Sequence, residues 1–166
     1  MVIVSTNAYF RNGLSTLLSE TGAQGVIFDR GDDFCIVTRP EVLSALMYKE
    51  NSFREFLLHD FFMINKGLPL EVIKNDVVKY YSGTRVSKTE PMKLSSREET
   101  VLSFLLEKRS YAEMSELLGL SAKIVSNLVR SILHKLYIPT LASFFNIVRR
   151  WHHLTSSGGV NYVEKQ

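Results

Sequence analysis

Apolar positions follow two different patterns along the chain. Up to residue 81, short apolar runs alternate with stretches whose apolar residues recur at helical spacing. The runs predict strands at 2–4, 26–28, 34–37 and 61–64, and the stretches predict helices at 8–20, 41–58 and 70–81. The second and third strands are separated by five residues, too few for a parallel crossover. They form either an antiparallel hairpin or are not both strands. Strands that alternate with helices indicate an α/β layer.

Downstream, the pattern is helical throughout. Ser95 and Ser96 stand three residues before Glu98 and Glu99, which is the capping-box spacing at a helix start. We expect helices from there to about residue 108, from 110 to 118 and from about 122 to 136, with Gly119 in the turn between the second and third. A fourth helix opens at 139–140. Its apolar side either closes this small domain or packs against the same helix of a second copy.

A polar stretch between the two patterns contains Gly83 and Pro91, and its apolar residues show no periodicity, which is typical of a linker. The expected organisation is therefore an α/β domain at 1–82, a linker at 83–92, an all-α four-helix domain at 93–153 and a polar tail at 154–166.

The third helix of the downstream domain has two faces. An apolar stripe is expected to be buried: Val125, Leu128, Ile132, Leu133 and Leu136. The residues largely off this stripe are polar or cationic: Lys123, Ser126, Asn127, Arg130 and His134. A short helix, a glycine and a newly capped helix are typical of a helix-turn-helix, whose second helix enters the major groove of DNA. An amphipathic helix with a solvated basic face fits the same pattern.

Charge is placed unevenly in this 166-residue chain, whose formal net charge is +3. Residues 1–92 hold ten Lys/Arg and eleven Asp/Glu, a net of −1, whereas residues 93–153 hold nine and five, a net of +4. No acid occurs between Glu116 and Glu164. A cationic stretch without acids attracts polyanions such as nucleic acid.

Composition and motifs exclude several classes. A content of 45% hydrophobic and 22% charged residues is that of a globular protein. The single cysteine, Cys35, cannot form an internal disulfide or a cysteine-based metal cluster, and residues 1–6 lack the basic leader of a signal peptide. No catalytic motif or metal-ligand pattern occurs, and His152 and His153 are expected to be surface residues. We expect no enzyme, no cofactor and a cytoplasmic protein, associated with the nucleoid when bound to DNA.

Residues 94–138 resemble the LuxR-type (FixJ/NarL-type) DNA-binding domain of bacterial response regulators. The resemblance rests on residues spread over its first three helices at fixed spacing: Leu94–Glu98, Val101-Leu102, Ser110-Tyr111, Glu113, Leu117–Ser121, Val125, Ile132-Leu133 and Lys135-Leu136. It implies that Ser126, Asn127 and Arg130 read bases and that Lys135 contacts phosphate. The DNA-binding set expected overall is Lys123, Val125, Ser126, Asn127, Arg130, His134 and Lys135. Ser126 stands where the family usually has a cation, which implies weaker or altered binding.

The upstream half resembles a shortened receiver domain at both of its ends. The matching residues are 2–4, 11–14 and 17–18 at the start, and 63–66, 70–73 and 81–83 at the end. Lys66 takes the position of the receiver lysine, but Ser5 and Thr6 replace the acidic pair that holds magnesium. The resemblance therefore implies no phosphoacceptor and no metal site. Asp29, Asp32 and Asp33 are candidate substitutes for this acidic pair, but the sequence favours a solvated turn for them.

These patterns predict a bacterial transcription regulator that binds double-stranded DNA without phosphorylation. Its first domain would mediate homodimerisation or pairing with a related regulator. Two alternatives stay open: a co-regulator that acts by protein–protein contact, and a regulator whose first domain senses a small ligand.

Overall fold

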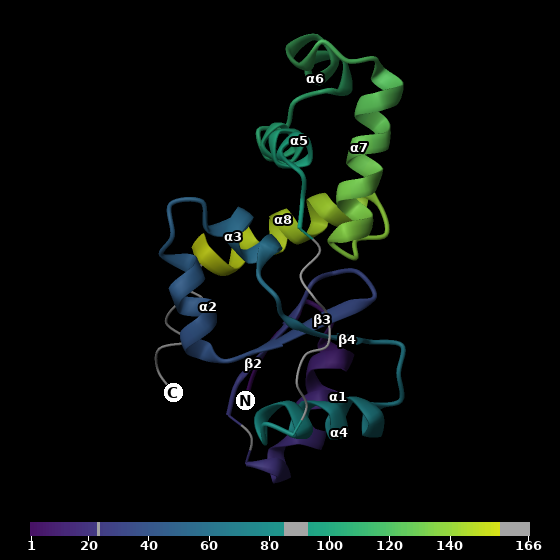
Figure 1. Cartoon of the computed structure of the whole chain (residues 1–166). Helices are drawn as coiled ribbons and strands as arrows, with labels where there is room; N and C mark the ends of the chain where they lie inside the picture. Colours follow the sequence, from purple (N-terminus) through teal and green to yellow (C-terminus); the bar gives the residue numbers. More distant parts are fainter. Residues whose placement is uncertain (23, 85–92, 157–166) are drawn as a thin grey trace. The chain divides into compact units, whose positions relative to one another are not determined.

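The computed structural model describes residues 1–22, 24–84 and 93–156 (Figure 1). Its contacts divide the chain into two units, residues 1–90 together with 145–166, and residues 91–144. Residues 85–92 of the predicted linker and 157–166 of the predicted tail lie outside the described residues. The division falls inside the last helix, so the second unit ends earlier along the chain than the expected domain at 93–153.

The first unit is built on a mixed sheet of four strands, β1 (Val2–Val4), β2 (Val26–Asp29), β3 (Phe34–Thr38) and β4 (Phe62–Asn65), in the order β1-β2-β3-β4. β1 is parallel to β2, whereas β2 and β4 each pair antiparallel with β3. The hairpin alternative for β2 and β3 is therefore confirmed. β1, β2 and β4 run in one direction, and the residues that follow them meet at one edge of the sheet.

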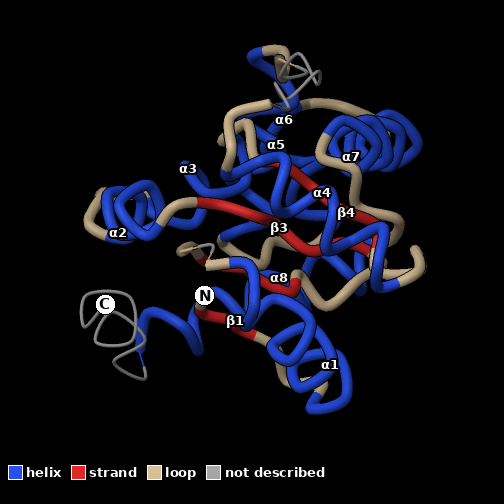
Figure 2. Tube along the Cα trace, turned by 90° about the horizontal axis from the view of Figure 1, so that it is seen from below, coloured by secondary structure: helices blue, strands red, loops and turns tan. Residues whose placement is uncertain are grey.

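One face of the sheet packs against two helices, α1 (Ala8–Leu18) and α4 (Leu70–Tyr81), and a short 3-10 turn, Ser19–Thr21, follows α1 (Figures 1 and 2). Leu14 and Leu18 of α1 and Ile73 and Val77 of α4 are buried in one cluster. The sheet contributes Ile27, Cys35, Val37, Phe62 and Ile64 to it. Alternate residues of each strand thus point to this face, as the pleat requires.

The opposite face carries an aromatic cluster. Trp151, 1% exposed, stacks on Phe56 at 4.3 Å between ring centroids, and Phe56 meets Phe28 of β2 edge-on at 5.3 Å. Phe53 lies 6.4 Å from Trp151, and the Trp151 indole N–H donates to Ser52 Oγ. The last helix, α8 (Leu141–Ser156), thereby packs its C-terminal part on the first unit.

The predicted single helix at 41–58 is wrong, because two helices occupy this range, α2 (Pro40–Met47) and α3 (Ser52–Leu58). The residues between them are mostly polar, and Tyr48, the largest, is 71% exposed. A continuous helix here would gain little burial to offset the entropy of ordering this turn.

The second unit is helical, with α5 (Ser96–Leu106), α6 (Tyr111–Leu118), α7 (Ala122–Lys135) and the first residues of α8. The predicted capping boxes are confirmed at Ser95/Glu98 and Ser110/Glu113. Its buried apolar residues are Val101, Leu102, Leu105, Met114, Val125, Val129, Ile132, Leu133, Leu136, Ile138 and Phe144. Leu128, expected in the buried stripe of α7, is half-buried, and Val129 takes its place.

The apolar side of α8 is buried inside the chain. Phe144 and Ile147 are 0% and 1% exposed, and Leu154 is 6% exposed. The N-terminal end of this helix closes the helical unit through Phe144, as one alternative expected, whereas Trp151 packs on Phe56 of the α/β unit, which neither alternative predicted.

We expect Trp151→Ala to lower the opening free energy of the first unit by about 3–5 kcal/mol, the usual cost of a large cavity in a core. Hydrogen exchange of amides in β2 and β3, followed by mass spectrometry, measures this. The neighbouring exposed residue gives a control, His152→Ala, which should change the same amides by less than about 0.5 kcal/mol. Equal exchange in both variants would contradict the packing of α8 on the sheet.

Candidate functional site

The turn before α7 fixes where this helix begins. α6 ends at Gly119, whose φ of 62° lies in the left-handed region that glycine adopts at little cost. The Ser121 side chain then accepts a hydrogen bond from the backbone N–H of Ile124. The predicted short helix, glycine turn and capped helix are therefore all present.

Four polar residues form one exposed stripe on α7: Lys123, Asn127, Arg130 and His134. Their spacing of four, three and four residues keeps them on one face of the helix, over a length of about 16 Å. Ser126 lies half-buried beside them. The helix thus presents ammonium, amide, guanidinium and imidazole groups along one side, and it buries the other.

Three of the seven expected DNA-binding residues do not belong to this stripe: Ser126, which lies beside it, and Val125 and Lys135. Val125 is 0% exposed and packs in the core of the helical unit, so its side chain cannot reach a ligand. Lys135 places Nζ 2.7 Å from the Glu98 carboxylate and 3.3 Å from the Lys93 carbonyl. The structure thus gives Lys135 a role inside the unit, where the sequence predicted a phosphate contact.

Glu98 joins α5 to α7. Glu98 is only 4% exposed. One of its carboxylate oxygens accepts a hydrogen bond from Ser131 Oγ at 2.6 Å, and the other accepts from Lys135 Nζ at 2.7 Å and from the Ser95 backbone N–H. Burial disfavours its charge, but these hydrogen bonds outweigh that effect and hold the pKa of Glu98 at about 2. The capping-box spacing located Glu98 at its helix start, but no sequence signal showed that it reaches α7.

Apolar side chains are exposed near the turn as well. Leu117 of α6 is 58% exposed and Ile124 in the first turn of α7 is 45% exposed. Exposed aliphatic groups can contact thymine methyls or the apolar surface of a protein partner.

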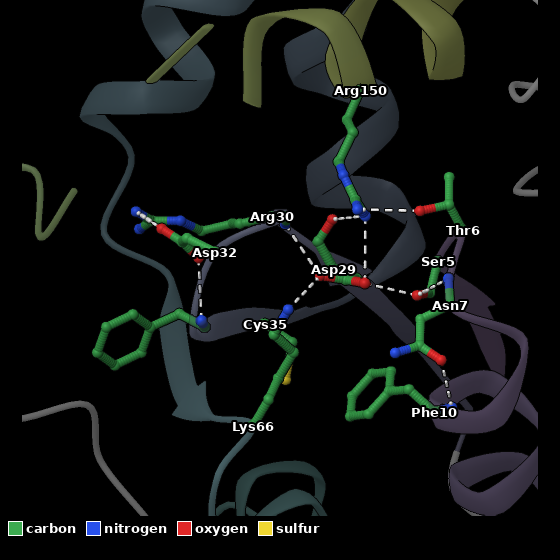
Figure 3. A network of polar contacts seen from close by, with 12 residues as sticks. Ser5, Thr6, Asn7, Phe10, Asp29, Arg30, Asp32, Cys35, Lys66 and Arg150 are labelled. Carbon is green, nitrogen blue, oxygen red and sulfur yellow. Dashed lines mark hydrogen bonds and ion pairs between the residues drawn. The ribbon is translucent and has the colours of Figure 1, made fainter. Parts of the chain in front are cut away.

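A second polar cluster lies in the first unit, at the sheet edge where β1, β2 and β4 end (Figure 3). Asp29, 2% exposed, accepts through Oδ1 from Lys66 Nζ at 2.8 Å and from the Gly31 backbone N–H at 2.9 Å, and through Oδ2 from the Ser5 hydroxyl. Burial opposes ionisation of Asp29, but these bonds, led by that from Lys66, set its pKa below the ordinary value.

Arg150 of α8 completes this cluster. Its Nη1 lies 3.1 Å from Asp29 Oδ2 and donates to the Asp29 carbonyl at 3.0 Å, while Nη2 donates to Thr6 Oγ1 at 2.9 Å (Figure 3). The guanidinium lies so close to Gly31, at φ 91°, that a Cβ there would collide with its Nε. The ion pair and the stacked Trp151 together hold α8 against the sheet.

The expected solvated turn is therefore wrong for two of the three acids. Asp29 pairs with Lys66 and Arg150, and the side chain of Asp32, 1% exposed, pairs with Arg30 at 2.7 Å. Asp33 alone is exposed, as the sequence predicted. A run of polar residues looks the same in sequence whether the turn is solvated or its acids pair with cations from elsewhere in the chain. The sequence therefore held no signal for the contact with Arg150.

This cluster has the chemistry of a structural link. Both carboxylate oxygens of Asp29 contact cations or hydrogen-bond donors. Within residues 1–22, 24–84 and 93–156, no group of three His, Cys, Asp or Glu residues is placed to hold a metal ion. Nearby Cys35 is fully buried, and burial raises the pKa of its thiol to about 12, which leaves it unreactive at neutral pH.

Comparison of the chain with protein-family models, with curated proteins and with solved structures gave no match. Across the described residues, no helix is both long and apolar enough to cross a bilayer.

The stability of the helical unit should depend on the charge of Glu98. Because its folded-state pKa of about 2 lies below the usual 4.5, its stabilising contribution is complete above pH 4.5 and is lost as the pH falls toward 2. We expect Glu98→Gln to remove about 2 kcal/mol at pH 7 and to flatten this acid dependence.

Hydrogen exchange of α5 and α7 amides between pH 3 and pH 7 provides the measurement. The exposed acid Glu116 serves as the control, and Glu116→Gln should leave both the stability and its acid dependence unchanged. An unchanged acid profile in Glu98→Gln would show that Glu98 does not anchor α7.

Proposed function

We propose that the chain is a transcription regulator that binds double-stranded DNA with α7 in the major groove. The observation that carries this proposal is the exposed stripe of Lys123, Asn127, Arg130 and His134 on a helix whose opposite face is buried. The major groove admits an α-helix, and the side chains on such a stripe meet base edges and phosphates along it.

Each member of the stripe has a defined chemistry toward DNA. Arg130 can bond the two acceptors of a guanine, and Asn127 can pair with an adenine through its amide. Lys123 lies in the first turn of α7, where the backbone N–H groups also favour phosphate. The first unit would serve homodimerisation or contact with a related regulator.

Two features of the second unit make the stripe well suited to sequence reading. The helix is held at its start by the Ser121 cap and near its end by the pair between Lys135 and Glu98. Since both ends are fixed, the exposed side chains keep their spacing, and little order has to be gained on binding.

The decisive experiment begins with an unbiased selection of duplexes that bind the full-length protein, followed by titrations of the selected site. Arg130→Ala should weaken binding by about ten- to a hundredfold, because a two-bond contact to guanine accounts for about 1–3 kcal/mol. Arg149 is an exposed arginine of α8, outside the proposed interface, so Arg149→Ala is the matched control and should stay within about twofold. Equal binding by Arg130→Ala and the unchanged protein at several salt concentrations would refute direct reading by α7.

A second function, a co-regulator that contacts another DNA-binding protein, is favoured by the exposed Leu117 and Ile124. Footprinting separates the two. A specific footprint made by the isolated protein supports the regulator, and one that needs a partner protein supports the co-regulator.

A further inference from the structure

A cavity of about 420 Å³ opens in the first unit beside β1, the edge strand of the sheet. Its walls come from β1, β2, the first turn of α1 and the C-terminal part of α8. Nothing in the DNA-binding proposal uses this cavity, which lies wholly within the α/β unit.

The cavity has the composition of a small-molecule site. Val4, Phe28 and Leu154 line it with apolar surface, and Thr6, Arg11, Arg150 and His153 add polar groups. Ligand sites of this size are usually apolar pockets with a few convergent polar groups that orient the ligand.

The polar lining carries positive charge that an anion can balance. Asp29 is the one acid of the lining, and its carboxylate already accepts from Lys66, Ser5 and Gly31 and pairs with Arg150 (Figure 3). Lys66, Arg150 and Asp29 together therefore carry a net charge of +1, and Arg11 adds a further positive charge.

Arg11 is the group best placed to meet a ligand. It is exposed, and its Nη1 makes a long contact of 3.5 Å to the Ser5 carbonyl. A guanidinium has five N–H donors in a planar fork that matches the two oxygens of a carboxylate. Arg150, in contrast, is committed to Asp29 and Thr6 and supplies mainly its charge.

We propose that this cavity binds an amphipathic monocarboxylate, with the carboxylate on Arg11 and the apolar body against Val4, Phe28 and Leu154. A monoanion fits better than a phosphate dianion, because apolar walls cannot replace the strong hydration of a dianion. A neutral molecule of the same shape would give Arg11 no carboxylate to pair with.

The proposal is tested by calorimetric titration of the full-length protein with octanoate, with octan-1-ol and with inorganic phosphate. We expect octanoate to bind at one site per chain, and octanol and phosphate to bind at least about tenfold more weakly. Arg11→Gln should weaken octanoate about tenfold or more. Arg39 is an exposed arginine of the same unit outside the cavity, so Arg39→Gln is the control and should bind within about twofold of the unchanged protein.

A second variant keeps the test independent of Arg11. Thr6 is an exposed residue at the cavity wall, and Thr6→Phe fills space there without opening the core, so it should also abolish octanoate binding. Absence of saturable octanoate binding would overturn the proposal. So would equal affinity for octanol, several octanoates per chain, or unchanged binding in Arg11→Gln or Thr6→Phe. No DNA is present in these titrations, so their outcome does not depend on the proposed function.

Discussion

The interaction on which the helical unit depends is the buried link from Glu98 to Ser131 and Lys135. It joins the start of α5 to the C-terminal half of α7 through a carboxylate whose oxygens are both occupied. Without this link α7 would be held by its apolar face alone, and aliphatic contacts do not fix the rotation of a helix as narrowly as directional hydrogen bonds do. Rotation is the property that matters, because it determines whether Asn127 and Arg130 face outward together.

The first unit depends on a similar arrangement of opposite charge. Asp29 pairs with Lys66, directly after β4, and with Arg150 of α8 at one sheet edge, and the stack of Trp151 on Phe56 adds apolar contact between α8 and the sheet. Two cations and a serine hydroxyl engage the Asp29 carboxylate, so this edge of the sheet is held by directional polar contacts.

Much of the fold was predictable because it is encoded locally. The caps at Ser95, Ser110 and Ser121 lie three residues before their partners, and Gly119 marks the turn between α6 and α7, so the helix boundaries in this region followed from short spacings. The hairpin of β2 and β3 was predicted as one of two alternatives, and the short connection settled that the pair could not be parallel.

What the sequence did not reveal depends on contacts between residues far apart in the chain. Arg150 is 121 positions from Asp29, and nothing in either neighbourhood indicates the other. The exposed stripe of α7 could be predicted from periodicity, but the ion pair between Lys135 and Glu98 could not. A lysine on a helix has the same sequence signature whether it faces water or a buried acid. The break between α2 and α3 was missed for a related reason: helical spacing continues across it, and only the exposure of Tyr48 shows that this turn has no core to face.

The most direct test of the account attaches an iron–EDTA cleavage reagent to a single cysteine introduced by Asn127→Cys. The native thiol, Cys35, is fully buried with a raised pKa and should stay unlabelled. With a duplex selected for binding, the account predicts strand cleavage confined to a few positions inside the bound site, and less localised cleavage by the same reagent at Asn75→Cys, an exposed position of α4. Cleavage by the Asn127 derivative that is no more localised than cleavage by the Asn75 derivative would contradict the placement of α7 in a DNA groove.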